Sequence, residues 1–150
     1  MKKRAATVRF IFFFLWISLC LGGASFAERI SVSANSASAR TGPGVKYEIV
    51  WDKLDRNYPL VVLDRKDDWY YVKDYENDKG WINKSFVDSH ESVITKKDSI
   101  NVRSGPGAQS NIVFKVDRGV PFKVLKRNGS WIEIQHSDGD SGWISSQLVW

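Results

Sequence analysis

Residues 55–63 read DRNYPLVVL and residues 117–125 read DRGVPFKVL, so one stretch of the chain is written twice. A tryptophan follows each stretch at the same spacing, Trp69 after the first and Trp131 after the second, and the copies are offset by 62 residues across this half of the unit. Self-similarity at a fixed period indicates repeated structural units. The 150-residue chain is therefore predicted to contain two copies of one small unit.

Glycine-rich blocks mark further positions in both copies. Gly-Trp-Ile occurs at residues 80–82 and again at residues 142–144, at the same offset of 62. Upstream, Arg-Thr-Gly-Pro-Gly at residues 40–44 matches Arg-Ser-Gly-Pro-Gly at residues 103–107, but at an offset of 63. One residue has therefore been gained or lost between these two parts of the unit. The Gly-Pro-Gly segments predict turns, since proline fixes φ and glycine supplies angles that other residues avoid.

Two pairs of equivalent positions alternate between asparagine and glycine. Asn57 corresponds to Gly119, and Asn77 corresponds to Gly139. These two residue types adopt positive φ more readily than any others. We therefore expect a left-handed turn residue at both places in both copies.

In combination, these motifs resemble the bacterial SH3-like domain. The shared pattern is Arg-(Thr/Ser)-Gly-Pro-Gly, Asp-Arg-(Asn/Gly)-x-Pro-x-x-Val-Leu, Trp-x-x-(Val/Ile) and Gly-Trp-Ile. The resemblance implies an all-β chain of two consecutive small SH3-like β-barrels. Such domains carry no catalytic residues and imply adhesion, targeting, or recognition of peptides and cell wall. The predicted domains are residues 28–88 and 93–150, joined by a short polar linker at residues 89–92.

The ends of the units are less regular. Residues 31–38 are small and mostly polar and predict a weak first strand, with residues 30–34 as a less ordered approach to it. Residues 84–87 and 146–149 are each expected to close a unit through a 3₁₀ turn and a short strand. Trp150 has no counterpart in the first copy, and it is expected to dock on the second barrel or on a partner.

The first 27 residues are typical of a secretory signal peptide. A basic start precedes an uncharged apolar stretch at residues 10–21, and Ser-Phe-Ala at residues 25–27 favours cleavage after Ala27. A retained anchor is the alternative, because about 18 apolar residues are the lower limit for a spanning helix. Lipidation of Cys20 is disfavoured, because Leu19 precedes it at the position where a lipoprotein-like pattern has Gly or Ala. We expect an exported periplasmic or envelope protein, or an extracellular one, without a stable membrane anchor.

Removal of the leader changes the charge argument. Of the 22 basic residues the leader holds four and no acidic ones, which leaves 18 basic and 17 acidic residues and a net charge of +1. This balance gives no reason to predict a nucleic-acid partner. Cys20 is the only cysteine, so the exported part has no disulfide. Its stability must come from apolar burial, to which the remaining tryptophans contribute.

Strand parity separates a core face from an outer face. Successive strand residues point to opposite sides. In the second copy Ile132 and Ile134 share one side, and Trp131 shares the other with Glu133. Because the charge of Glu133 belongs outside, Trp131 is predicted to lie on the outer face. By the same parity, Leu60 and Val62 of the first copy, like Phe122 and Val124 of the second, are predicted to face the cores, and Trp143 the outside.

The same parity predicts an outer aromatic patch on the first barrel, formed by Trp69, Tyr71 and Trp81. Two interpretations remain open. The rings are either peripheral core covered by loops, or a binding groove, since exposed aromatic clusters mark interaction sites. The candidate ligand-binding residues are those on the two outer faces, namely Trp69, Tyr71, Trp81, Trp131 and Trp143.

Catalytic and metal-binding constellations are not recognisable in the sequence. The two histidines, His90 and His136, fall in the predicted linker and beside a turn, without a cysteine, and solvated loop positions are the favoured interpretation. No cofactor is predicted. Arg40 and Arg103 recur at the entrance of the Gly-Pro-Gly loop, and we expect them to brace that loop through backbone carbonyls or an acid.

The sequence thus predicts an exported, non-enzymatic binding protein. Its expected partner is cell-wall peptidoglycan peptide or an envelope protein. The alternative is a structural or regulatory partner of a neighbouring envelope enzyme, without wall binding.

Overall fold

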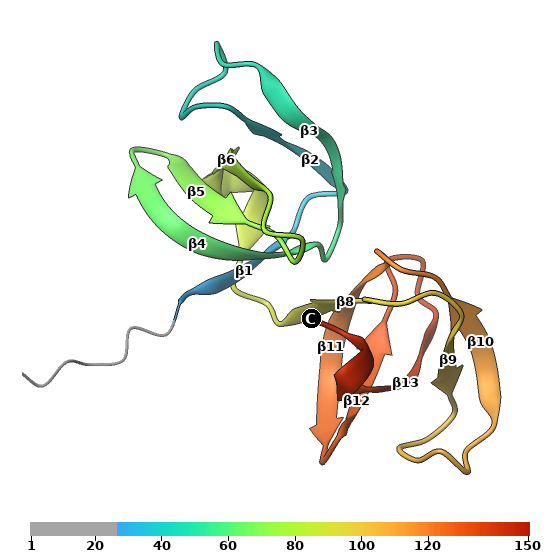
Figure 1. Cartoon of the computed structure of the whole chain (residues 1–150). Helices are drawn as coiled ribbons and strands as arrows, with labels where there is room; N and C mark the ends of the chain where they lie inside the picture. Colours follow the sequence, from blue (N-terminus) through green and yellow to red (C-terminus); the bar gives the residue numbers. More distant parts are fainter. Residues whose placement is uncertain (1–26) are drawn as a thin grey trace, which may run out of the picture.

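A computed structural model describes residues 27–150, so the predicted leader lies outside the described residues except for Ala27. Within that part, the chain consists of β-strands and two short 3₁₀ helices, which confirms the predicted all-β class. The strands form two separate sheets (Figure 1). No helix in residues 27–150 has the length and apolar character needed to cross a membrane.

The first sheet has the strand order β3-β2-β6-β5-β4-β1-β7, and its neighbouring strands are antiparallel. It is strongly curved around its own core (Figure 1). Its elements are β1 (Arg29–Val32), β2 (Ser36–Arg40), β3 (Ile49–Asp55), β4 (Pro59–Lys66), β5 (Trp69–Lys73), β6 (Lys79–Asn83), η1 (Lys84–Phe86) and β7 (Val87–Asp88).

The second sheet repeats this plan with the order β10-β9-β13-β12-β11-β8. Each unit closes through a 3₁₀ helix, as predicted, which is followed by β7 in the first unit and by an isolated bridge of Val149 with Thr95 in the second. Its elements are β8 (Ser92–Ile94), β9 (Ile100–Arg103), β10 (Ile112–Val116), β11 (Pro121–Asn128), β12 (Trp131–Gln135), β13 (Ser141–Ser145) and η2 (Ser146–Leu148).

Each sheet encloses an apolar core of its own. Among the described residues, none belongs to both cores. The first core contains Ile30, Val32, Ala37, Ala39, Leu54, Leu60, Val62, Val72 and Ile82. The second contains Val93, Ile100, Val102, Phe122, Ile132, Ile134, Ile144 and Val149. Parity therefore placed the core faces of the central strands correctly.

The turn residues follow the asparagine–glycine pairing of the sequence. Asn57 has φ 69° and Gly119 has φ 82°, while Asn77 has φ 69° and Gly139 has φ 105°. All four lie in the left-handed region that asparagine and glycine tolerate best. The predicted positive φ is confirmed at both places in both copies.

The glycine of Gly-Trp-Ile is required by close packing. A Cβ on Gly142 would lie 2.6 Å from Cγ1 of Val102 and 2.9 Å from the carbonyl oxygen of Arg103. A Cβ on Gly80 would meet the smaller Ala39, at 3.0 Å from its Cβ. The second unit is therefore packed more tightly at this crossing than the first.

The change of offset from 63 to 62 arises inside β3. Between β2 and β3 the register shifts twice, whereas between β9 and β10 it shifts once. The additional irregularity lies between the pairs Ala37–Leu54 and Ala39–Trp51, where three steps on β3 match two on β2. The extra residue of the first copy is thus absorbed as a β-bulge, which inserts one residue without breaking the strand pair.

The start of the first unit differs from the prediction. Residues 29–32 form the regular strand β1, which pairs with both β4 and β7, so the expectation of a less ordered approach at residues 30–34 is wrong. Two strands distant in the sequence bury Ile30 and Val32, although the local sequence is small and polar. Tertiary pairing overrides weak local propensity here.

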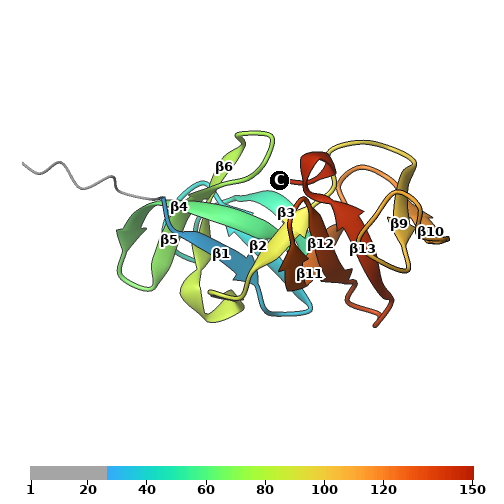
Figure 2. The same ribbon diagram turned by 90° about the horizontal axis from the view of Figure 1, so that it is seen from below.

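The two barrels lie side by side, with the end of the chain between them (Figure 2). The backbone of Trp150 exchanges hydrogen bonds with Ile94 of the second barrel, and the guanidinium of Arg29 of the first barrel lies 4.0 Å from the Trp150 ring. Trp150 thus docks on the second barrel and also contacts the first. Ser92, the last residue of the predicted linker, is a buried residue of β8.

Candidate functional site

A groove lies on the first barrel where β2, β5, β6 and η1 meet the loop of residues 41–48. Its volume is about 390 Å³. Trp69, at the start of β5, supplies its aromatic wall, and Phe86 of η1 and Val45 of the loop supply apolar walls. The remaining lining residues are Ser36, Ala37, Ser38, Arg40, Asn83 and Ser85. We call this cavity groove 1.

The second barrel carries a groove at the equivalent place, which we call groove 2. It is smaller, about 250 Å³, and Trp131 supplies its aromatic wall. Leu148 stands where groove 1 has Phe86, and Ala108 stands where it has Val45. The other lining residues are Lys97, Asp98, Ser99, Ile100, Asn101, Arg103 and Ser145. The repeat of the sequence is thus also a repeat of a cavity.

Arginines hold the loop that forms one wall of each groove. Nη1 of Arg40 donates to the carbonyl oxygens of Val45 and Tyr47, at 3.1 and 2.8 Å. Nη1 of Arg103 donates to the carbonyl oxygen of Ser110 at 2.8 Å. The prediction that these arginines brace the loop through backbone carbonyls is confirmed. In groove 1 this fixes Val45, although 80% of that residue is exposed.

The predicted aromatic residues divide into two groups. Trp69 and Trp131 line the grooves, whereas Tyr71 and Trp81 do not line groove 1 and Trp143 does not line groove 2. Tyr71 and Trp81 instead pack on each other, with ring centroids 5.1 Å apart and a tilt of 31°. The three rings of the first barrel are partly exposed, while the alternate residues Val72 and Ile82 are buried.

The pair of Tyr71 and Trp81 lies beside groove 1. Trp81 is opposite Arg40 on β2, and Tyr71 is two positions after Trp69 on β5. In the second barrel the residue opposite Trp143 is Glu133, so an aromatic pair is replaced by one ring and one carboxylate. The surroundings of the first groove are accordingly more apolar than those of the second.

Sequence reasoning missed Phe86 and Val45 as groove residues. Phe86 is 42% exposed, which is unusual for so large an apolar side chain beside a barrel. The repeat itself carried a signal, since Leu148 occupies the equivalent position of the closing 3₁₀ helix. No pattern in the sequence pointed to Val45, because the other apolar residues that line the groove, Trp69 and Phe86, are distant from it in the sequence.

The two grooves differ in charge. The only charged residue lining groove 1 is Arg40, whose guanidinium is bonded to the loop. Asn83 accepts from the backbone N–H and the hydroxyl of Ser85, at 3.0 and 2.7 Å, and so caps η1. Groove 2 is lined in addition by Lys97 and Asp98. Groove 1 therefore combines apolar walls from Trp69, Phe86 and Val45 with small polar side chains, as in sites that bind small ligands or peptide segments.

Comparison with known proteins identifies the repeat. The family described as "Bacterial SH3 domain" matches residues 33–88 and again residues 96–150, which together make up most of the chain. The chain belongs to this family. The fold is therefore that of two consecutive bacterial SH3 domains, as the motifs predicted.

Several named proteins contain similar sequence. The chain is 26% identical over 130 residues to a putative N-acetylmuramoyl-L-alanine amidase of Bacillus subtilis, which covers 79% of this chain and 24% of that protein. It is 33% identical over 66 residues to a probable cell wall amidase of Staphylococcus epidermidis, which covers 43% of this chain and 22% of that protein. This chain thus matches only about a quarter of the length of these relatives.

Solved structures resemble the chain more distantly. An NlpC/P60 family protein of Bacillus cereus covers 82% of this chain and 56% of its own, at 12% identity and a TM-score of 0.39. NlpC1 of Trichomonas vaginalis covers 83% of this chain and 45% of its own, at 17% identity and a TM-score of 0.36.

The histidines of these SH3 domains have structural contacts. Nε2 of His90 lies 3.1 Å from Oδ1 of Asn57, its Nδ1 contacts the carboxylate of Asp88, and its side chain is only 20% exposed. Burial opposes ionisation of Asp88, but hydrogen bonds from the backbone and ring of His90 hold its pKa below the ordinary value. The expectation of a solvated loop histidine is therefore wrong for His90, which packs on the first SH3 domain.

Three carboxylates in the turn after β5 lie close together, those of Asp74, Glu76 and Asp78. The buried Asp74 accepts from the backbone N–H groups of Glu76 and Asp78, at 2.9 and 3.0 Å, and from the hydroxyl of Tyr58 at 3.1 Å. Burial, with Asp74 nearby, raises the pKa of Tyr58 well above its ordinary value. These contacts make Asp74 the organiser of the turn.

Proposed function

We propose that this protein is an exported, non-catalytic binding protein whose SH3 domains recognise the peptide part of the bacterial cell wall. The observation that carries the proposal is the duplicated groove, in which a tryptophan, a second apolar wall and an arginine-braced loop recur at equivalent positions. A purely structural repeat needs its core and turns, but it has no need for a cavity that recurs on its outer face.

The chemistry of groove 1 suits a short, extended peptide. Trp69 and Phe86 offer flat apolar surface, and the small polar residues of β2 offer hydroxyls for backbone groups. The lack of an acidic residue in the lining disfavours a strongly cationic ligand. Aromatic anchors supply much of the affinity in such sites because they bury large area at little conformational cost.

The named relatives support a cell-wall ligand. The relatives of Bacillus subtilis and Staphylococcus epidermidis are named as amidases that act on the wall or its building blocks, and this chain matches only a quarter or less of each. We propose that this chain corresponds to the part that attaches such proteins to the wall.

The test measures retention of the purified protein on isolated peptidoglycan. Phe86 lines groove 1 and Leu63 lies on a β-bulge away from it, and the two side chains are 42% and 43% exposed. Phe86→Asp and Leu63→Asp therefore introduce the same charge at matched exposure. We expect Phe86→Asp to weaken retention at least about tenfold, whereas Leu63→Asp leaves it unchanged.

Two outcomes would contradict the proposal. Equal retention of both variants and the wild type would remove groove 1 from binding. No retention of the wild type on peptidoglycan, together with a change in the activity of an envelope hydrolase on addition of the protein, would favour the alternative role as a regulatory partner.

A further inference from the structure

The two SH3 domains meet through contacts that fix their relative orientation. Ser31 Oγ lies 2.5 Å from Ser92 Oγ, and Ser31 also donates to the carbonyl oxygen of His90 at 2.7 Å. Val61 on β4 and Ile94 on β8 are buried but belong to neither core, and these two strands contact each other. The junction therefore has an apolar centre as well as hydrogen bonds.

Two further contacts join the domains. Arg29 of the first domain stacks on Trp150 of the second. Arg118 of the second domain pairs with Glu76 at 2.5 Å and lies 5.8 Å from the ring centroid of Tyr75. These contacts add to the hydrogen bonds and the buried centre of the junction.

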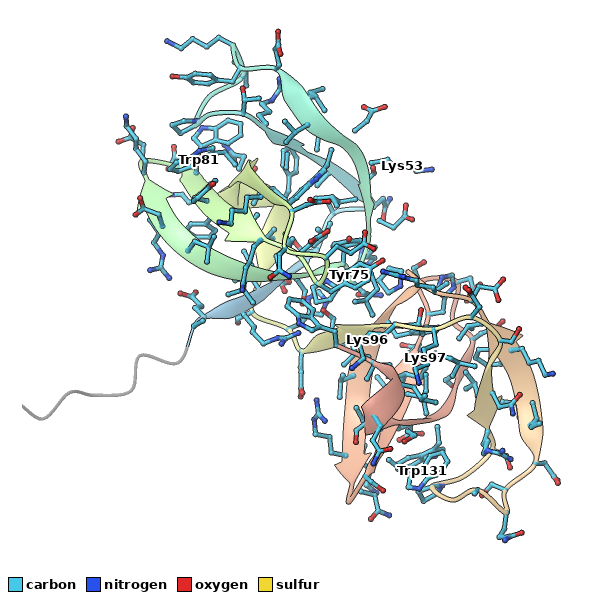
Figure 3. All side chains as sticks on the ribbon, in the orientation of Figure 1. Lys53, Tyr75, Trp81, Lys96, Lys97 and Trp131 are labelled. Atoms are coloured by element: carbon cyan, nitrogen blue, oxygen red, sulfur yellow. The ribbon has the colours of Figure 1, made fainter. Side chains whose placement is uncertain are left out.

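The grooves lie away from this junction. The first domain uses β1, β4 and the turn after β5 for the junction, but β2, the start of β5, β6 and η1 for groove 1. Figure 3 shows Trp81, beside groove 1, and Trp131, in groove 2, at opposite ends of the molecule, with Tyr75 near the junction between them. The two grooves thus lie towards opposite ends of the molecule, with the junction between them.

We infer that the protein binds two separate wall peptides at once and so bridges them, an inference that rests on the proposed function. A domain of 60 residues is roughly 25 Å across, so grooves on the far sides of two such domains are on the order of 30–50 Å apart. An extended peptide spans at most about 3.6 Å per residue, so it needs roughly 8–14 residues to reach both grooves. Each groove, of about 390 or 250 Å³, has room only for a short segment, so one short peptide does not fill both.

A capture assay tests bridging with the full chain. The protein is first bound to immobilised peptidoglycan, and fluorescent, sonicated wall fragments are then added. Wild-type protein is expected to capture fragments through its unoccupied grooves. Val45→Asp and Ala108→Asp change equivalent loop positions that line grooves 1 and 2. Each is expected to lower the fragment captured per retained molecule at least tenfold.

The results separate this inference from the function on which it rests. Retention of the wild type without fragment capture would overturn bridging and leave wall binding intact. Capture by both single variants at the wild-type level would also overturn it, because bridging would then arise from association of two molecules. Absence of retention would overturn both proposals. Circular dichroism of each variant confirms the fold, and Leu63→Asp, at an exposed bulge outside the grooves, is the charge-matched control.

Discussion

Groove 1 is expected to supply most of the affinity, and the comparison of Trp69→Ala with Trp131→Ala measures how much. Trp69 faces Phe86 and Val45 in a groove of about 390 Å³, whereas Trp131 faces Leu148 and the small Ala108 in one of about 250 Å³. The larger groove with two bulky apolar walls removes more of a bound side chain from water. Since burial contributes about 25 cal/mol per Å² of apolar surface, the difference favours groove 1.

The expected magnitudes follow from this difference. Truncation of a well-packed aromatic anchor typically costs at least about 2 kcal/mol, or roughly thirtyfold in Kd, and we expect this for Trp69→Ala. For Trp131→Ala we expect about 1 kcal/mol, or roughly fivefold. The Kd for soluble wall fragments is measured by fluorescence anisotropy at fixed salt. Thermal unfolding followed by circular dichroism shows that each variant remains folded at the assay temperature.

Two results would refute this reasoning. An unchanged Kd in a folded Trp69→Ala protein would mean that the ring is peripheral core and not a ligand contact. A larger loss from Trp131→Ala would preserve the groove as a site but reverse the order of the two domains. The second result would also show that Lys97 and Asp98, which line only groove 2, contribute more than apolar area does.

Three further predictions concern stability and processing. Gly142→Ala is expected to destabilise its domain by about 3 kcal/mol and Gly80→Ala by about 1 kcal/mol. The reason is that only a Cβ on Gly142 would lie less than 3.0 Å from a backbone oxygen. Urea unfolding measures both variants, and an equal fall of the two midpoints would contradict this prediction. The pKa of Asp88 is lower in the folded state than in the unfolded state, so its ionised carboxylate stabilises the fold. This contribution is present above the unfolded pKa of about 3.9 and is lost as pH falls through the folded pKa. Asp88→Asn should therefore lower the free energy of unfolding at pH 7 but change it little at pH 2. Mass spectrometry of the exported protein is expected to show cleavage after Ala27, and an intact first residue or a lipid on Cys20 would exclude it.

The features that the sequence predicted correctly are local or repeated. Positive φ at Asn57 and Asn77 depends on the residue's own backbone preference, and the glycines at the equivalent positions of the second copy revealed that preference. The bracing of the loop by Arg40 follows from a similar comparison, since an arginine recurs beside each Gly-Pro-Gly turn. Each of these inferences needed only neighbouring residues and a second example.

The features that the sequence did not predict depend on distant partners. β1 is a strand because β4 and β7 border it, and neither is near it in the sequence. The groove joins Val45 and Phe86 with Trp69, three residues from three segments that parity treats separately. The polar linker predicted a solvated His90, but the ring of His90 contacts the side chain of Asn57, which lies 33 positions earlier in the sequence. Contacts of this kind are properties of the closed barrel and have no local pattern.

The differences between the two copies are of two kinds, one insertion and a set of substitutions. The additional residue of β3 is placed in a bulge near Lys53, which projects from the first barrel well away from Trp81 (Figure 3). The braced loops that wall the two grooves therefore remain equal in length, eight residues each, at 41–48 and 104–111. The bulge lies opposite Ala37 and Ser38 of β2, which line groove 1, whereas the braced loop of that groove keeps its length.

Substitution, by contrast, has changed the cavity while its frame is kept. Phe86 is replaced by Leu148 and Val45 by Ala108, whereas the tryptophan and the arginine recur in both copies. Both grooves stay open to solvent and differ in size and charge. Under the proposed function, the two grooves are therefore expected to differ in selectivity.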